Sequence, residues 1–266
     1  MPTKDERYLD IVLDPIRVCA NYKPKFGQGQ GAGLSVDQFS DLYRGDTFYA
    51  GFGLDNPLMY AAHKAAGGMT SVYRQIGIGA ERLFRAVLRD ELGLGPDDVT
   101  WSYQVSMPNG RSRTLSLDGR IPVDAVTDPV KRGRVRDWID GAAAQVGVDG
   151  SSLKGVVFEV RQGYKSKDSK RQNADIANGT KAYDIDHLPC AAVMSGQIDT
   201  DIVIRYRANR WCIITGAGDE GDPYTNTYAF MEQVVGYDLA GFLERNRDVI
   251  FGEVDQVLRA LLSPED

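Results

Sequence analysis

The stretch Gly155-Val156-Val157-Phe158-Glu159-Val160-Arg161 decides the fold of this chain. A short apolar run of β-branched and aromatic residues is typical of a strand buried in a sheet. Helical patterns flank it, over 128–148 before it and over 168–183 after it. Because helices that alternate with strands cover the faces of a sheet, we expect this stretch to be a core strand of an α/β fold.

The pattern continues on both sides of this strand. Apolar residues at helical spacing predict a helix over 78–94, which Gly93 ends. Apolar runs and alternation predict strands over 99–107, 188–194 and 211–215, with a hairpin turn at 108–110. Residues 113–126 predict one or two more strands, interrupted at Asp118-Gly119. Residues 198–206 fit either a strand or a helix, and residues 226–262 predict two or three helices. We therefore expect a central mixed sheet flanked by helices.

The chain has 266 residues, enough for one large domain or two small ones. Residues 1–70 predict a mostly helical N-terminal extension, and residues 71–266 predict the core with its C-terminal helices. The two parts are expected either as separate domains or as one continuous domain.

Composition excludes several classes of protein. The net charge of −6 excludes a uniformly basic nucleic-acid coat, but it leaves room for local basic patches. Three distant cysteines and two histidines argue against a disulfide framework and against a zinc site. No apolar run approaches the roughly 20 residues that span a bilayer. We expect a soluble, cytoplasmic protein with no membrane partner.

Glu159 is the first candidate for chemistry, because a carboxylate within an apolar strand needs a cation or a donor. Arg161 shares its face of the strand, since side chains alternate. Four further cations follow closely: Lys165, Lys167, Lys170 and Arg171. A carboxylate beside many cations favours a site for Mg²⁺ and a phosphate. The alternative is a structural Glu159–Arg161 pair followed by a solvated basic turn.

Three more acids are candidates. Asp124 lies in an apolar stretch and would meet Glu159 if strands 121–126 and 155–161 are neighbours. Asp118 precedes Gly119, a pair typical of a turn, and is a second candidate metal ligand. Glu81 lies in the first turn of the predicted helix, where it either complements the helix dipole or positions metal-bound water.

A helix with an early Glu, a strand with Asp, a strand with Glu-x-Arg and then a helix resemble the PD-(D/E)xK nuclease superfamily, over roughly residues 77–215. Residues 163–175, with Leu188-Pro189-Cys190, Gln197-Ile198-Asp199 and Ile204-Arg205-Tyr206, resemble type II restriction endonucleases, and within them the ApaLI-like group. The resemblance implies a Mg²⁺-dependent enzyme that hydrolyses phosphodiester bonds of double-stranded DNA at a specific sequence. For a palindromic site it also implies a homodimer, with 226–262 as a candidate dimer face. It further implies that the helical extension over residues 1–70 contacts DNA.

Carried onto this chain, the resemblance makes Asp124 the first acid of the motif and Glu159 the second. The motif's lysine position falls on Arg161, which keeps the charge but cannot act as a base. Either Arg161 acts electrostatically, or Lys165 or Lys167 reaches the place of the lysine.

The helix after Glu159 is then expected to face DNA. Its beginning, with Ser169 and Lys170 after Lys167, suits a phosphate. Four following side chains are of the types that read base edges, namely Arg171, Gln172, Asn173 and Asp175. The alternative is an ordinary polar helix face. A second basic cluster, Lys131, Arg132, Arg134 and Arg136, suits contacts with the DNA backbone or is a solvated face.

Other functions remain open. Arg161 in place of lysine is compatible with a DNA-binding protein on a degenerate nuclease fold, and the same core fits a repair or junction nuclease. The stretch Gly216-Ala217-Gly218-Asp219-Glu220-Gly221 matches the glycine pattern of dinucleotide sites. Its acids oppose a pyrophosphate, so we expect a loop after a strand.

Overall fold

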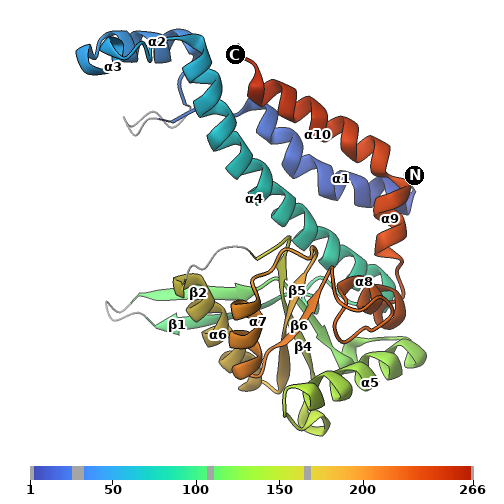
Figure 1. Ribbon diagram of the computed structural model, residues 1–266. Coiled ribbons are helices and arrows are strands. Elements are labelled where there is room, and N and C mark those ends of the chain that lie inside the picture. The colour runs from blue at the N-terminus through green and yellow to red at the C-terminus, as the bar shows by residue number, and fades with distance from the viewer. Residues whose placement is uncertain (1–2, 26–32, 107–110, 165–168, 265–266) are drawn as a thin grey trace. The chain divides into compact units, whose positions relative to one another are not determined.

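The computed structural model describes residues 3–25, 33–106, 111–164 and 169–264, without the side chains of residues 106 and 169–171. The chain divides into two compact units (Figure 1). One comprises Met1–Gly79 with Arg245–Asp266, and the other Ala80–Glu244. The expected division at residue 70 placed the C-terminal helices with the core. In the structure the last helix instead belongs to the N-terminal unit.

The N-terminal unit is helical. It contains α1 (Lys4–Arg17), the 3₁₀ turn η1 (Val18–Asn21), α2 (Val36–Arg44), α3 (Thr47–Gly51), most of α4 (Pro57–Leu92) and α10 (Arg247–Leu262). Capping boxes at Thr3 and Ser35 begin α1 and α2. Leu13 and Ile16 of α1 pack with Val72 of α4 and with Val257 and Leu261 of α10, which closes a small apolar core.

The second unit is built on strands. A hairpin pairs β1 (Trp101–Ser106) with β2 (Ser112–Leu117). A mixed four-stranded sheet has the order β3-β4-β5-β6, in which β3 (Gly119–Pro122) is antiparallel to β4 (Gly155–Arg161). The strands β5 (His187–Val193) and β6 (Cys212–Thr215) continue the sheet in parallel with β4. The mixed sheet predicted from the sequence is confirmed.

Helices cover both faces of this sheet (Figure 1). Ala182 of α6 (Ser169–Tyr183) and Ile202 of α7 (Thr200–Ala208) pack with Val157 on one face. On the other face Phe158 lies against Trp138 of α5 (Pro129–Gln145), with ring centroids 6.3 Å apart. Residues 198–206, which fitted either structure, contain most of helix α7.

The remaining elements are short. They are the 3₁₀ turns η2 (Val123–Ala125) and η3 (Gly150–Ser152), and then α8 (Thr227–Ala229), the π-helical η4 (Phe230–Val235) and α9 (Leu239–Arg245). The one or two strands predicted over 113–126 are two, β2 and β3, interrupted at Asp118 as expected, and η2 replaces the strand after Pro122. The helices predicted over 226–262 are confirmed.

The helix predicted over 78–94 starts far earlier, at Pro57. Gly67 and Gly68 lie inside this helix, and other parts of the N-terminal unit pack closely against both. A Cβ at Gly67 would lie 2.0 Å from the Tyr22 hydroxyl, and one at Gly68 would lie 2.4 Å from a Leu261 methyl. These glycines are contact points inside a helix.

We predict that Phe158→Ala destabilises the fold by about 3–5 kcal/mol, because it opens a cavity between β4 and its aromatic neighbours. Phe158 is fully buried and also contacts Phe84 and Phe230. Urea unfolding followed by circular dichroism measures the change. Ile204→Ala, at an exposed position of α7, is the control and should change stability by less than about 0.5 kcal/mol. Equal effects of the two substitutions would contradict this account of the core.

Candidate functional site

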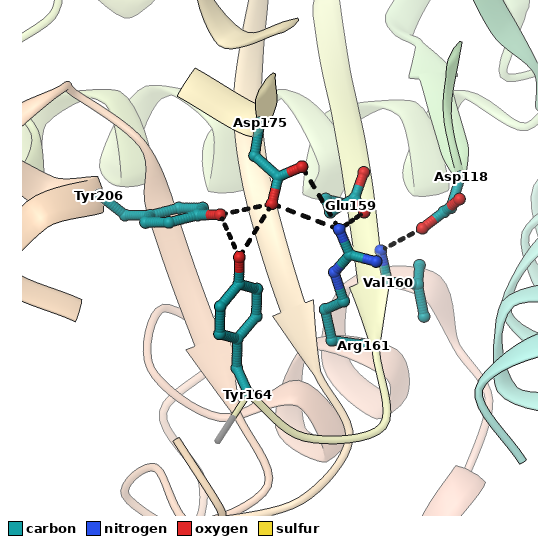
Figure 2. Close-up of polar contacts among 7 residues, drawn as sticks. All are labelled: Asp118, Glu159, Val160, Arg161, Tyr164, Asp175 and Tyr206. Atoms are coloured by element: carbon teal, nitrogen blue, oxygen red, sulfur yellow. Dashed lines mark hydrogen bonds and ion pairs between the residues drawn. The ribbon is translucent and has the colours of Figure 1, made fainter. Parts of the chain in front are cut away.

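Asp118 lies where one strand changes partner. Leu117 before it pairs with Trp101 of the hairpin, and Gly119 after it pairs with Phe158 of the four-stranded sheet. The Asp118 N–H donates to the Phe158 carbonyl at 2.7 Å, and the Val160 N–H donates to the Asp118 carboxylate at 2.9 Å. Asp118 is therefore not a turn residue. Its carboxylate is fixed to the backbone of β4 beside Glu159 (Figure 2).

The register of β3 on β4 decides between the two candidate aspartates. Strands β3 and β4 are neighbours, as expected, but they run antiparallel, with Pro122 opposite Gly155. Asp124 therefore lies beyond the Gly155 end of β4, whereas Glu159 lies near the other end. Asp124 is also exposed, in η2. The expectation that Asp124 meets Glu159 is wrong, and Asp118 occupies that place.

Arg161 lies between two buried carboxylates (Figure 2). Its Nη2 atom forms an ion pair with Glu159 on the same face of β4, as alternation predicts. The same Nη2 lies 3.3 Å from both carboxylate oxygens of Asp175 on α6. The Arg161 Nε is buried and has no hydrogen-bond partner among the residues that the structure describes. One nitrogen of the guanidinium is thus shared between two acids from two elements.

Asp175 is held on its other side by two tyrosines. The Tyr206 hydroxyl of α7 donates to Asp175 Oδ2 at 2.5 Å, and the Tyr164 hydroxyl donates to the same oxygen at 3.3 Å. The two hydroxyls lie 3.2 Å apart. The Arg161 guanidinium also lies 5.7 Å from the centre of the Tyr164 ring. No spacing pattern in the sequence predicts that these tyrosines contact an acid beside Glu159.

Burial and neighbouring acids raise the pKa of both Asp118 and Glu159. Burial and then the charge of Glu81 raise the pKa of Asp118 from 3.8 to about 6. Burial and then the charge of Asp118 raise the pKa of Glu159 well above its ordinary value, and Arg161 opposes this rise. Burial alone would lower the pKa of Arg161, but the charges of Glu159 and Asp175 raise it. Negative charge is concentrated here beyond what one arginine neutralises.

Glu81 joins this cluster from α4. It is half-buried, and Arg85 one turn later donates to its carboxylate at 2.6 Å. Its charge acts on both Asp118 and Glu159. Because α4 begins at Pro57, the expectation that Glu81 lies in the first turn of its helix is wrong, and so is the alternative that it complements a helix dipole.

The donor set fits a hard divalent cation. Mg²⁺ prefers oxygen ligands and takes one or two carboxylates together with phosphate and water. Asp118 and Glu159 supply such carboxylates, and a bound cation would offset the burial and the neighbouring negative charge that raise the pKa of both acids. Within the described ranges, no group of three or more His, Cys, Asp and Glu side chains is arranged to hold a metal ion as it stands. Glu159 is engaged by Arg161 in this conformation.

The predicted DNA-reading face of α6 points partly inward. Gln172 and Asp175 are only 5% and 4% exposed. Arg205 of α7 donates to Gln172 at 2.7 Å and also bonds the exposed Asn173. The expectation that Gln172 and Asp175 contact bases is wrong, because both side chains are buried and bonded within the protein. Asn173 remains a candidate at the surface.

Several predicted contacts fall outside the described residues. Lys165 and Lys167, the alternative holders of the lysine role, lie there, as does the predicted turn at 108–110. The backbone of Ser169, Lys170 and Arg171 begins α6, but their side chains are not described.

The basic cluster of α5 contacts the protein itself. Lys131 bonds the Glu91 carbonyl, Arg132 donates to the Val126 carbonyl at 2.8 Å, and Arg136 donates to the Gly150 carbonyl at 2.7 Å. These three cations bond backbone carbonyl groups of neighbouring segments in the second unit. The glycine stretch 216–221 follows β6, and the next helix begins only at Thr227 with Asn226 as its cap, so the loop predicted after this strand is confirmed.

Comparisons with known proteins found no matching protein family, no matching curated protein and no matching solved structure. Among the described residues, no helix is both long and apolar enough to cross a membrane.

We predict that Asp118→Asn stabilises the metal-free protein at pH 8 by about 1–3 kcal/mol. The folded-state pKa of Asp118 lies above its unfolded value, so folding favours the protonated acid. The stability that this gives is complete below about pH 4 and is lost as the pH rises through about 6. An asparagine stays neutral and can still accept from the Val160 N–H.

Urea unfolding in EDTA at pH 4 and at pH 8 measures this effect. The gain from Asp118→Asn should be absent at pH 4 and present at pH 8. Asp124→Asn, at an exposed acid nearby in the sequence, is the matched control and should give no gain at either pH. A loss of stability in Asp118→Asn at pH 8 would show that the charge of Asp118 is favourable and would contradict the prediction.

Proposed function

We propose that this protein is a Mg²⁺-dependent endonuclease that hydrolyses phosphodiester bonds of double-stranded DNA at a specific sequence, in the manner of type II restriction enzymes of the PD-(D/E)xK kind. The observation that carries the proposal is the meeting of Asp118, Glu159 and Arg161, with Glu81 adding charge from α4. Asp118, directly before β3, thus lies beside the Glu-x-Arg pair of the neighbouring strand β4.

The place of the cluster in the sheet supports this proposal. In open α/β sheets, ligands bind at the carboxyl ends of the parallel strands. Glu159 and Arg161 lie at that end of β4, and Arg161 pairs in register with Val193 at the same end of β5. The cluster therefore lies where a substrate is expected to approach.

Each side chain has a role in the proposal. Asp118 and Glu159 would hold Mg²⁺, with Glu81 as a further acid that orients water. A bound Mg²⁺ supplies an activated water and neutralises phosphate charge. Arg161 stabilises negative charge that develops on the phosphate, since it remains charged at every working pH.

We expect purified protein to cut a long DNA duplex into discrete fragments with Mg²⁺ and not with EDTA. Asp118→Asn and Glu159→Gln should each reduce the rate by roughly a hundredfold or more, because each removes a charged oxygen ligand. A gel of the cleaved duplex measures this, and mapping the fragment ends gives the site of cleavage.

Asp124→Asn is the matched control for the cleavage experiment. Its carboxylate is exposed and lies past the far end of β4, so the variant should cut like the wild type. A loss of cutting in Asp124→Asn with full activity in Asp118→Asn would overturn the assignment of the acids.

One observation favours a second candidate, a DNA-binding protein that does not cut. Arg161 occupies the lysine position and is ion-paired to Glu159. Such a protein would shift a duplex on a native gel equally with Mg²⁺ and with EDTA and would never cleave it. Absence of both cutting and shift at low salt would remove both candidates.

We also propose a two-fold dimer, as cleavage of both strands at a palindrome requires. Apolar side chains of α10, Val249, Phe251 and Leu262, are exposed and suit a dimer face. Sedimentation should give twice the chain mass, and Phe251→Asp should shift the protein towards the monomer. A monomer both free and on DNA would exclude the dimer.

A further inference from the structure

The shared guanidinium of Arg161 raises a conflict within the proposed metal site. In the described part of the chain, the carboxylate of Glu159 forms its ion pair with Arg161. A divalent cation on Glu159 would lie next to the positive charge of Arg161, and the repulsion of two adjacent cations in a buried site is large. Arg161 and the metal therefore compete for Glu159.

Asp175 is placed to receive Arg161. Both of its oxygens already lie 3.3 Å from the nitrogen that contacts Glu159. The tyrosine hydroxyls at 2.5 and 3.3 Å hold its carboxylate from the opposite side, so it stays in position whether or not Arg161 moves. Asp175 makes no other described contact that would compete for the guanidinium.

We infer that Asp175 is a positioning residue that takes the Arg161 guanidinium from Glu159 when a divalent cation binds. Arg161 is then an internal counter-ion that occupies the site in the absence of metal, and Asp175 sets how readily it leaves. This inference rests on the proposed function, because it needs a divalent cation on Glu159. Asp175 is buried on α6, and in this role it serves the metal site instead of contacting solvent or DNA.

The inference predicts opposite effects of two substitutions on metal affinity. Arg161→Gln removes the competitor and should tighten binding of Mn²⁺ about tenfold. Asp175→Asn removes the receiver, so Arg161 stays on Glu159 and Mn²⁺ binding should weaken by a similar factor. A purely structural role for the pair would weaken binding in both variants.

The double variant separates action through Arg161 from simple loss of negative charge. If Asp175 acts through Arg161, Asp175→Asn should have little effect on Mn²⁺ binding once Arg161→Gln is present. Equal weakening in both backgrounds would mean that Asp175 acts only by its own charge, and it would overturn the inference. Should Arg161→Gln fail to fold, Arg161→Met takes its place in the same cycle, because it also removes the competing cation and keeps a long unbranched side chain.

Free Mn²⁺ counted by electron paramagnetic resonance at pH 8, without DNA, gives the affinities of the full-length protein and its variants. Lys154→Gln is the matched control, since it also removes one cation next to β4, from an exposed pair with Asp186 at 2.7 Å. It should leave the affinity unchanged within about twofold.

The outcomes distinguish this inference from the proposed function. Glu159→Gln should abolish Mn²⁺ binding if the ion occupies this site. Absence of binding in every variant would remove the metal site, and the inference with it. Binding that depends on Glu159 but weakens in Arg161→Gln would leave the metal site standing and overturn the inference alone.

Discussion

The ion pair of Arg161 with Glu159, extended to Asp175, is the interaction on which the second unit depends. Burying one carboxylate costs several kcal/mol unless a cation and donors compensate it, and here two carboxylates are buried. The compensation ties β4 to α6, and through Tyr206 it reaches α7. The helices on this face of the sheet are thus held by polar contacts as well as by the apolar core.

The central strand and its neighbours were predictable because a buried strand is a short run of apolar residues in the sequence. Strands β4, β5 and β6 are short apolar runs, and these runs alone predict all three strands with nearly correct ends. The choice between Asp118 and Asp124 was not predictable in this way. It depends on the antiparallel register of β3 against β4, which is set by pairing between residues about 40 positions apart.

The buried face of α6 was predicted to be exposed, for a related reason. Its inward residues include Gln172, Asp175 and Asn178, which look like a solvated face. They are buried because each finds a partner on another element: Arg205 for Gln172, the tyrosines and Arg161 for Asp175, and Tyr103 for Asn178 at 2.6 Å. Polar residues spaced three apart on a helix can therefore form a buried polar face. The sequence alone does not predict this, because it does not identify their partners.

The acids at positions 81, 118, 159 and 175 come from four separate elements, and α5 is inserted between the two strands that carry Asp118 and Glu159. Contacts between residues so far apart in the chain cost loop-closure entropy, so the cluster exists only while all four segments stay packed together. Local unfolding that releases one segment takes its acid out of the cluster even where the rest of the unit keeps its fold. The proposed activity would therefore be lost before the whole unit unfolds.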